Sequence, residues 1–161
     1  MAGSNTGESA QADDRRRRPI RLVRHRCGAL RLRWWPGRLH QLQHLLDEHS
    51  FWAQGRSTGQ LRTMLAGSQA VLSAWDGSAL VGFGRASSDG AFRAVLWDVV
   101  VAGDHQGQGL GRRLVEALLA DPALAAVERI YLMTTNSAGF YHQLGFEQID
   151  QQKLMLKRSE T

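Results

Sequence analysis

The stretch WDVVVAGDHQGQGLGRRLVEALLA, residues 97–120, decides the fold. An apolar run enters it, a polar loop follows, and leucines then recur at helical spacing. The loop contains Gly107, Gly109 and Gly111. This pattern predicts a buried strand, a glycine-rich turn and an amphipathic helix in succession. Because the first N–H groups of a helix are unpaired and carry partial positive charge, such a turn can bind an anion.

Two common nucleotide-binding loops do not fit this turn. A P-loop requires a lysine after its last glycine, and no lysine is near. The dinucleotide fingerprint requires a glycine three positions after Gly109, where Arg112 stands. The pattern that remains is Gln106-x-x-Gly109-x-Gly111. Its glycines let bare backbone approach a bulky anion such as a diphosphate, and the arginines that follow add positive charge.

Periodicity along the rest of the chain predicts a mixed α/β fold, with six to seven strands in a central twisted sheet and helices on both faces. The expected order is β-α-α-β-β-β-α-β-α-β. Alternation predicts the first strand near 29–34, and a helix over 58–68 would use Thr58 as its cap. Asp76-Gly77 indicates a hairpin. The final segment, 146–158, predicts one or two further strands.

The positive charge is concentrated at the N-terminal end. The chain of 161 residues has a net charge of +5, but residues 1–38 hold ten arginines against three acidic residues, and the remainder is weakly negative. We expect residues 1–18 to be a disordered, arginine-rich tail and 19–161 to be a single domain. Such a tail could touch nucleic acid, an anionic membrane or an acidic partner. The sequence shows no nucleic-acid-binding motif, which disfavours a dedicated module of that kind.

Several other classes are disfavoured. No apolar run reaches the roughly 18 residues of a membrane helix, and the N-terminus does not read as a secretory signal, so we expect a cytoplasmic protein with no membrane contact. Cys27 is the only cysteine and excludes an internal disulfide. His40 and His44 have a spacing that can bind zinc, but without a third ligand we expect no metal site.

Two motifs together resemble the GNAT superfamily of N-acetyltransferases. The first is Gln106-x-x-Gly109-x-Gly111, which fits the family signature [RQ]-x-x-G-x-[GA]. The second is TTNSAGFYHQLGFEQ, residues 134–148, with a tyrosine shortly before Gly-Phe. The resemblance covers roughly residues 28–156. More narrowly, the sequence is similar to the cyanobacterial and plastid branch, which includes serotonin (arylalkylamine) N-acetyltransferases and protein acetyltransferases.

The resemblance implies acetyl-CoA as co-substrate, with no metal, and direct attack by a primary amine. The acceptor would be an arylalkylamine such as serotonin, or a protein lysine or N-terminus. Tyr141 would be the general acid on the coenzyme A sulfur, and the Val101 backbone would donate to pantetheine. The implied cofactor-binding residues are Val99, Val100, Val101, Gln106, Gly107, Gln108, Gly109, Leu110, Gly111, Arg112, Asn136, Phe140 and Tyr141.

The general base is open at this point. Asp98 is the only carboxylate in the long strand, which makes it a candidate catalytic residue. Strand alternation points it away from the side of Val95 and Trp97, where the family places its base, although a bulge could turn it inward. A water-mediated base and a structural aspartate are the alternatives. The helix and loop that carry Phe51 and Trp52 would form the acceptor wall, although Trp52 could equally belong to the core.

Two functions of other classes remain open. One is a non-catalytic acetyl-CoA-binding sensor that has kept the fold and lost the chemistry, against which Tyr141 argues. The other is an adaptor that binds nucleic acid or a protein partner through its arginine-rich arm. The resemblance also allows a homodimer.

Overall fold

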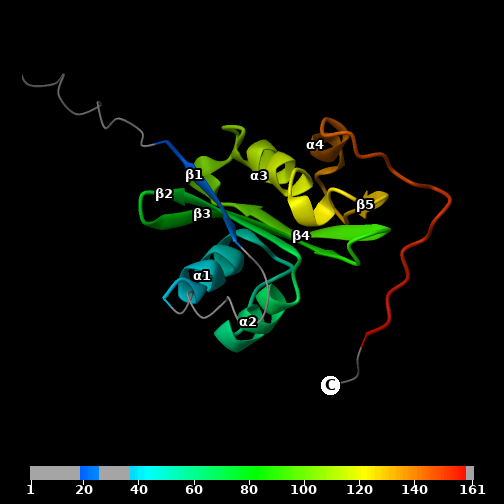
Figure 1. The fold of residues 1–161 in the computed structure, drawn as a ribbon. Coiled ribbons are helices and arrows are strands. Elements are labelled where there is room, and N and C mark those ends of the chain that lie inside the picture. The colour runs from blue at the N-terminus through cyan, green and yellow to red at the C-terminus, as the bar shows by residue number, and fades with distance from the viewer. Residues whose placement is uncertain (1–18, 26–36, 159–161) are drawn as a thin grey trace, which may run out of the picture.

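The computed structural model describes residues 19–25 and 37–158. They form one sheet with helices on both faces (Figure 1). The strands are β1 (Arg21–His25), β2 (Ala70–Asp76), β3 (Ala79–Ser88), β4 (Arg93–Val101) and β5 (Arg129–Tyr131). The helices are α1 (Leu39–His49), α2 (Thr58–Ala66), α3 (Leu110–Leu119) and α4 (Ala138–His142). None of the helices in these ranges is long and apolar enough to cross a bilayer.

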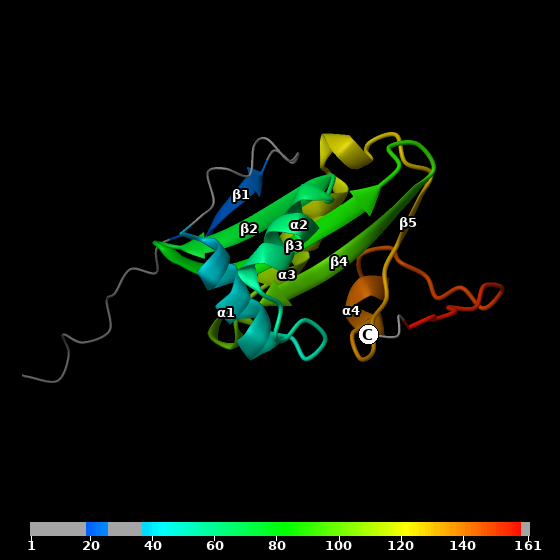
Figure 2. The same cartoon turned by 90° about the horizontal axis from the view of Figure 1, so that it is seen from below.

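The sheet has the order β1-β2-β3-β4-β5. Its pairs are antiparallel except β4 with β5, which is parallel. Helices α1 and α2 cover one face and α3 the other, as Figure 2 shows from below. The leucines of α1 (Leu39, Leu42, Leu45 and Leu46) are all buried, as their spacing predicts.

The expected count of six to seven strands is not reached, since five strands lie in the described residues. The strand expected at 29–34 and the tail over 1–18 lie outside those residues. The segment 146–158 contains no strand. Its alternation defines which side chains share a face, but a strand also needs a neighbour for its N–H and C=O groups. None of the strands in the described part of the chain pairs with this segment.

The loop between α1 and α2 is held by polar side chains of both helices. Asp47 Oδ1 accepts from the Gly55 N–H over 2.8 Å, and Gln43 Nε2 donates to the Arg56 carbonyl over 3.0 Å. Ser57, not the expected Thr58, caps α2. Ser57 and Gln60 form a reciprocal capping box, which the sequence allows because a glutamine stands three residues after the serine. These bonds give the loop a defined shape.

A β-bulge interrupts β4. Arg85 pairs with Trp97 and Phe83 with Val100, so two residues of β4, Asp98 and Val99, oppose one of β3. Asp98 has a φ of 50°, a left-handed conformation that aspartate tolerates better than most residues. The extra residue shifts the alternation of the strand, because two successive residues can then share a face.

The packing on the two sides of the bulge confirms this shift. Leu96 belongs to the core cluster beneath α3, whereas Val100 belongs to the cluster beneath α1 and α2. In a regular strand these two residues, four positions apart, would share a face. The parallel partner β5 pairs only with Arg93–Val95, so β4 and β5 separate before the bulge is reached.

Helix α3 packs closely on β3 because β3 has glycine at the contact. A Cβ built on Gly82 would lie 2.9 Å from Leu114 Cδ1 and 3.1 Å from the Ala74 Cβ. Leu114 is fully buried, so its methyl group has little room to move.

We therefore expect Gly82→Ala to lower the free energy of unfolding by about 1–3 kcal/mol through overpacking. Gly59→Ala is the matched control, since Gly59 is in α2 and a Cβ there meets only Ser57 Oγ at 3.8 Å. Because alanine is the better helix former, this change should raise stability by up to about 1 kcal/mol. Urea denaturation measures both, and equal effects of the two changes would contradict the close packing.

Candidate active site

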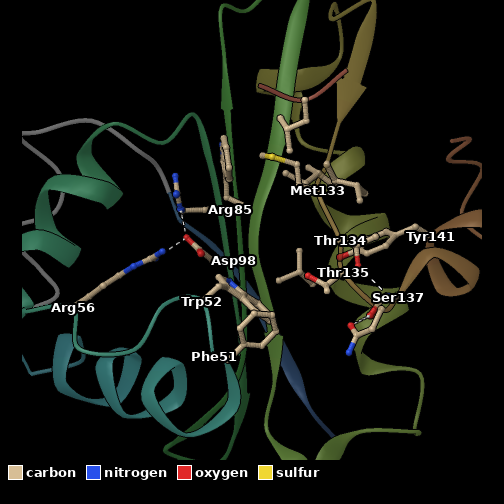
Figure 3. Close-up of a pocket in the computed structure, with 16 residues that line it drawn as sticks. Phe51, Trp52, Arg56, Arg85, Asp98, Met133, Thr134, Thr135, Ser137 and Tyr141 are labelled. Carbon is tan, nitrogen blue, oxygen red and sulfur yellow. Dashed lines mark hydrogen bonds and ion pairs between the residues drawn. The ribbon is translucent and has the colours of Figure 1, made fainter. Parts of the chain in front are cut away.

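A pocket of about 550 Å³ opens where β4 and β5 separate. Its walls come from the α1–α2 loop, the middle of β4, the segment after β5, and α4 (Figure 3). Because β5 pairs with β4 only as far as Val95, the residues that follow in β4 present backbone groups to the gap. A cavity of this size suits a small-molecule ligand.

Asp98 lies in a charged cluster on one wall of the pocket. Arg85 Nε donates to Asp98 Oδ2 over 2.7 Å, and Arg56 Nη1 lies 3.1 Å from the same oxygen. The Asp98 side chain is 4% exposed, and a charge so buried requires partners. Two guanidinium groups against one carboxylate leave the cluster with a net positive charge.

The bulge brings Asp98 into the pocket. Simple alternation, which directs Asp98 away from the side of Trp97, is wrong here, because Arg85 contacts both the Asp98 carboxylate and the Trp97 ring. Within the described residues, both arginine contacts fall on Oδ2 and no hydrogen bond reaches Oδ1. Oδ1 is therefore the oxygen of Asp98 that is left without a partner among these residues.

Phe51 and Trp52 form an aromatic edge on the same side of the pocket (Figure 3). They are 66% and 49% exposed, so Trp52 does not belong to the core. Their ring centroids lie 5.0 Å apart at an interplanar angle of 89°. Two exposed aromatic rings beside a cavity offer a surface for an apolar or aromatic ligand.

Tyr141 stands across the pocket from Asp98, beside Thr134 and Thr135 (Figure 3). Its ring packs edge-on against Phe140, with centroids 4.9 Å apart, and against Phe146. Burial raises the pKa of Tyr141, because a phenolate would lose its hydration there. The hydroxyl therefore keeps its proton through the neutral pH range and is able to donate it.

The glycine-rich turn leads from β4 into α3. Gly107 and Gly109 have φ values of 70° and 78°, and a Cβ on either would meet nothing within 4 Å. Gly109 is the N-cap of α3 and has no side chain to bond the first N–H groups. The first turn of α3 contains no acidic residue. This helix end is thus an open cradle of N–H groups, suited to an anion such as a diphosphate.

Comparison with known proteins decides the family. The model described as the Acetyltransferase (GNAT) family matches residues 29–146. The chain belongs to the GNAT family of acetyltransferases. Members of the family use acetyl-CoA as co-substrate and act on amine acceptors.

The relatives agree with the plastid branch of the GNAT family. The chain is 49% identical to Serotonin N-acetyltransferase 2, chloroplastic, of Oryza sativa subsp. japonica, over 41% of this chain and 34% of that protein. It is 34% identical to the uncharacterized N-acetyltransferase ycf52 of Pyropia yezoensis, over 67% of this chain and 64% of that protein. The chain thus spans between about a third and two thirds of these relatives' lengths.

A solved GNAT structure has the same fold. It is the GNAT family protein SP0256 from Streptococcus pneumoniae TIGR4, with a TM-score of 0.68 and 23% identity. The match covers 88% of this chain and 99% of that one. At this identity the likeness concerns the fold alone.

The residues expected to bind the GNAT co-substrate fall into two groups. Val99, Asn136 and Tyr141 line the pocket, whereas Gln106 to Arg112 form the cradle at α3. Phe140 lies close to the cradle, since a Cβ built on Gly111 would be 3.6 Å from the Phe140 ring.

Other residues expected to bind the co-substrate can contact it only through their backbone groups. The side chains of Val100 and Leu110 are buried in the core, so only their main-chain groups can take part. Gln106 Nε2 donates to the Val101 carbonyl over 2.9 Å, which shows that this carbonyl points away from β3. Because N–H and C=O of one strand residue point to the same side, the Val101 N–H also faces the gap. Gln108 Nε2 donates to the Asp104 carbonyl and holds the turn together.

Sequence reasoning missed Arg56 and Arg85. Arg85 interrupts the apolar strand β3, and an arginine in such a strand signals a buried anion nearby. No pattern pointed to Arg56, which lies 42 positions before Asp98. For metals, no group of three or more His, Cys, Asp or Glu lies together within the described ranges. His44 instead contacts Glu48 over 3.2 Å.

We predict that Gly109→Ala weakens acetyl-CoA binding at least about tenfold, since a methyl group would enter the cradle and displace charge-assisted N–H contacts. Gly90→Ala is the control, because Gly90 has a φ of 79° and an equally open Cβ position in the β3–β4 turn. Both changes should cost about 1–2 kcal/mol of stability. Titration calorimetry with acetyl-CoA separates them, and unchanged affinity in Gly109→Ala would rule out the cradle.

Proposed function

We propose that this protein is an acetyl-CoA-dependent N-acetyltransferase that acts on a primary amine by direct attack. The observation that carries the proposal is the continuity of two features. Phe140 links the cradle at the N-terminus of α3 to the pocket between β4 and β5, because it lies beside Gly111 and its ring packs against Tyr141 of the pocket wall. An anionic donor bound at the first would extend its reactive end into the second.

The residues present fit acetyl-CoA. The open N–H groups from Gly109 to Arg112 suit its diphosphate, and the Val101 N–H suits an amide of its pantetheine arm. The co-substrate supplies an acetyl group on a thioester. In the pocket the Val99 and Asn136 walls would enclose the donor.

Tyr141 supplies the acid. In the reaction a C–N bond forms, a C–S bond breaks, the nitrogen loses a proton and the sulfur gains one. The raised pKa of Tyr141 keeps its hydroxyl protonated, so it can give this proton to the departing sulfur. Tyr141 and Asp98 both line the pocket, and Figure 3 shows them on opposite sides of β4.

Asp98 supplies the base. An amine attacks only after it has lost the extra proton of its ammonium form. Oδ1 of Asp98 has no hydrogen-bond partner among the described residues, so it can accept that proton directly or through a water. The two arginines on Oδ2 position the carboxylate.

The acceptor is a small amine in this proposal. The chain is similar over part of its length to a protein named serotonin N-acetyltransferase, and the exposed rings of Phe51 and Trp52 suit an aromatic group. Protein lysines and N-termini are the other acceptors to test. A non-catalytic sensor would bind acetyl-CoA tightly and turn over no amine.

An acceptor screen tests the function. Thiol release from acetyl-CoA should depend on an added primary amine, with aromatic amines ahead of polyamines. Tight acetyl-CoA binding without turnover on any amine or peptide would support the sensor instead. The adaptor alternative requires salt-sensitive nucleic-acid binding that disappears when residues 1–18 are deleted.

We expect Tyr141→Phe to lower kcat about tenfold or more, because the acid is lost, while the affinity for acetyl-CoA is nearly kept. Tyr131→Phe is the control, since Tyr131 lies in β5 and lines a neighbouring cavity, not this pocket. Steady-state kinetics with both variants decides the role. Equal kcat in the two variants would exclude Tyr141 as the acid.

A further inference from the structure

The charged side chains that line the pocket indicate which class of amine would fit it. Arg56, Arg85 and Asp98 are the charged residues on its walls within the described chain, and together they are positive by one charge. A simple alkylamine arrives as a cation and gains nothing from a positive site. A ligand that carries an anion beside its amino group would balance it.

Arg56 is the more exposed of the two arginines, and it has donors without a partner among the described residues. Its Nη1 contacts Asp98 Oδ2 at 3.1 Å and Met64 Sδ at 3.5 Å, and no contact within the described residues falls on Nε or Nη2. Its side chain is 31% exposed. Arg85, in contrast, donates to Asp98 and to Ser68 Oγ and lies against the Trp97 ring, with its side chain 15% exposed.

We propose that the acceptor is an α-amino acid with an aromatic or bulky apolar side chain, its carboxylate bound by Arg56 and its amino group held at Asp98. This inference rests on the proposed function and narrows its acceptor. The two receptor groups are in contact with each other, so the charges they bind must also be neighbours on the ligand. The amino and carboxylate groups of an α-amino acid share one carbon.

The side chain of the amino acid would contact the aromatic edge formed by Phe51 and Trp52. Phe51 and Trp52 come from the same loop as Arg56 and stand on the same side of the pocket (Figure 3). The hydrogen bonds that hold this loop fix its backbone at Gly55 and Arg56, which limits where the guanidinium can reach. An aromatic side chain would therefore lie on the rings while the carboxylate reaches Arg56.

Tryptophan and tryptamine make the test, because they differ only in the carboxylate. We expect kcat/KM for tryptophan to exceed that for tryptamine about tenfold or more, the value of a charge-assisted hydrogen bond pair. Arg56→Gln should remove this preference, so that kcat/KM falls about tenfold or more further for tryptophan than for tryptamine. Arg56→Lys should restore part of it. Arg93→Gln, at an exposed arginine at the far end of β4, should keep the preference.

Indole-3-propionate, which has the carboxylate but no amine, should compete with tryptophan in the wild type and lose this inhibition in Arg56→Gln. A purely structural role of Arg56 would lower turnover of both amines equally and would overturn the inference. So would tryptamine turned over as well as tryptophan, with the acetyltransferase itself intact. Absence of turnover with every amine would instead refute the proposed function, and this inference with it.

Discussion

The bulge in β4 is the constraint on which the pocket depends. Two residues of β4 stand opposite Gly84, so the alternation of the strand changes phase there. Before the bulge the strand packs Leu96 beneath α3, and beyond it the strand packs Val100 beneath α1 and α2. At the bulge itself Asp98 takes a φ of 50° and turns into the cavity. Since β5 has already separated from β4, the segment of β4 around the bulge has backbone N–H and C=O groups without a strand partner on that side, and it also carries the Asp98 carboxylate.

A buried carboxylate must be balanced, and the way in which Asp98 is balanced joins distant elements. Arg85 reaches it from the adjacent strand and Arg56 from the α1–α2 loop. Removing either arginine would leave a poorly compensated charge in a site with little water, which is costly. The cluster thus fixes the loop that carries Phe51 and Trp52 against β4, and it makes the acceptor side of the pocket electrostatically positive.

In the proposed function, the donor side and the acceptor side of the site recognise their ligands by different physical means. The donor side uses backbone: uncapped N–H groups at α3, with Gly107 and Gly109 keeping side chains out of the way. The acceptor side uses side chains, with charges and aromatic rings from the α1–α2 loop. Backbone recognition needs only a local conformation, so it can be shared by a whole family. Side-chain recognition depends on which residues meet, so it can differ between members of the GNAT family.

This difference explains what could be predicted. The sequence by itself determined the strand, turn and helix of residues 97–120 and the glycine turn at Gly109, because periodicity and glycine act through neighbouring residues. The placement of Tyr141 in the site followed only from the resemblance to the GNAT family. Only the tertiary structure decided that Asp98 faces inward, that Arg56 meets it across 42 positions, and that 146–158 has no strand partner. A bulge depends on the register between two strands, and an ion pair or strand pair depends on groups brought together by packing, which no local pattern encodes.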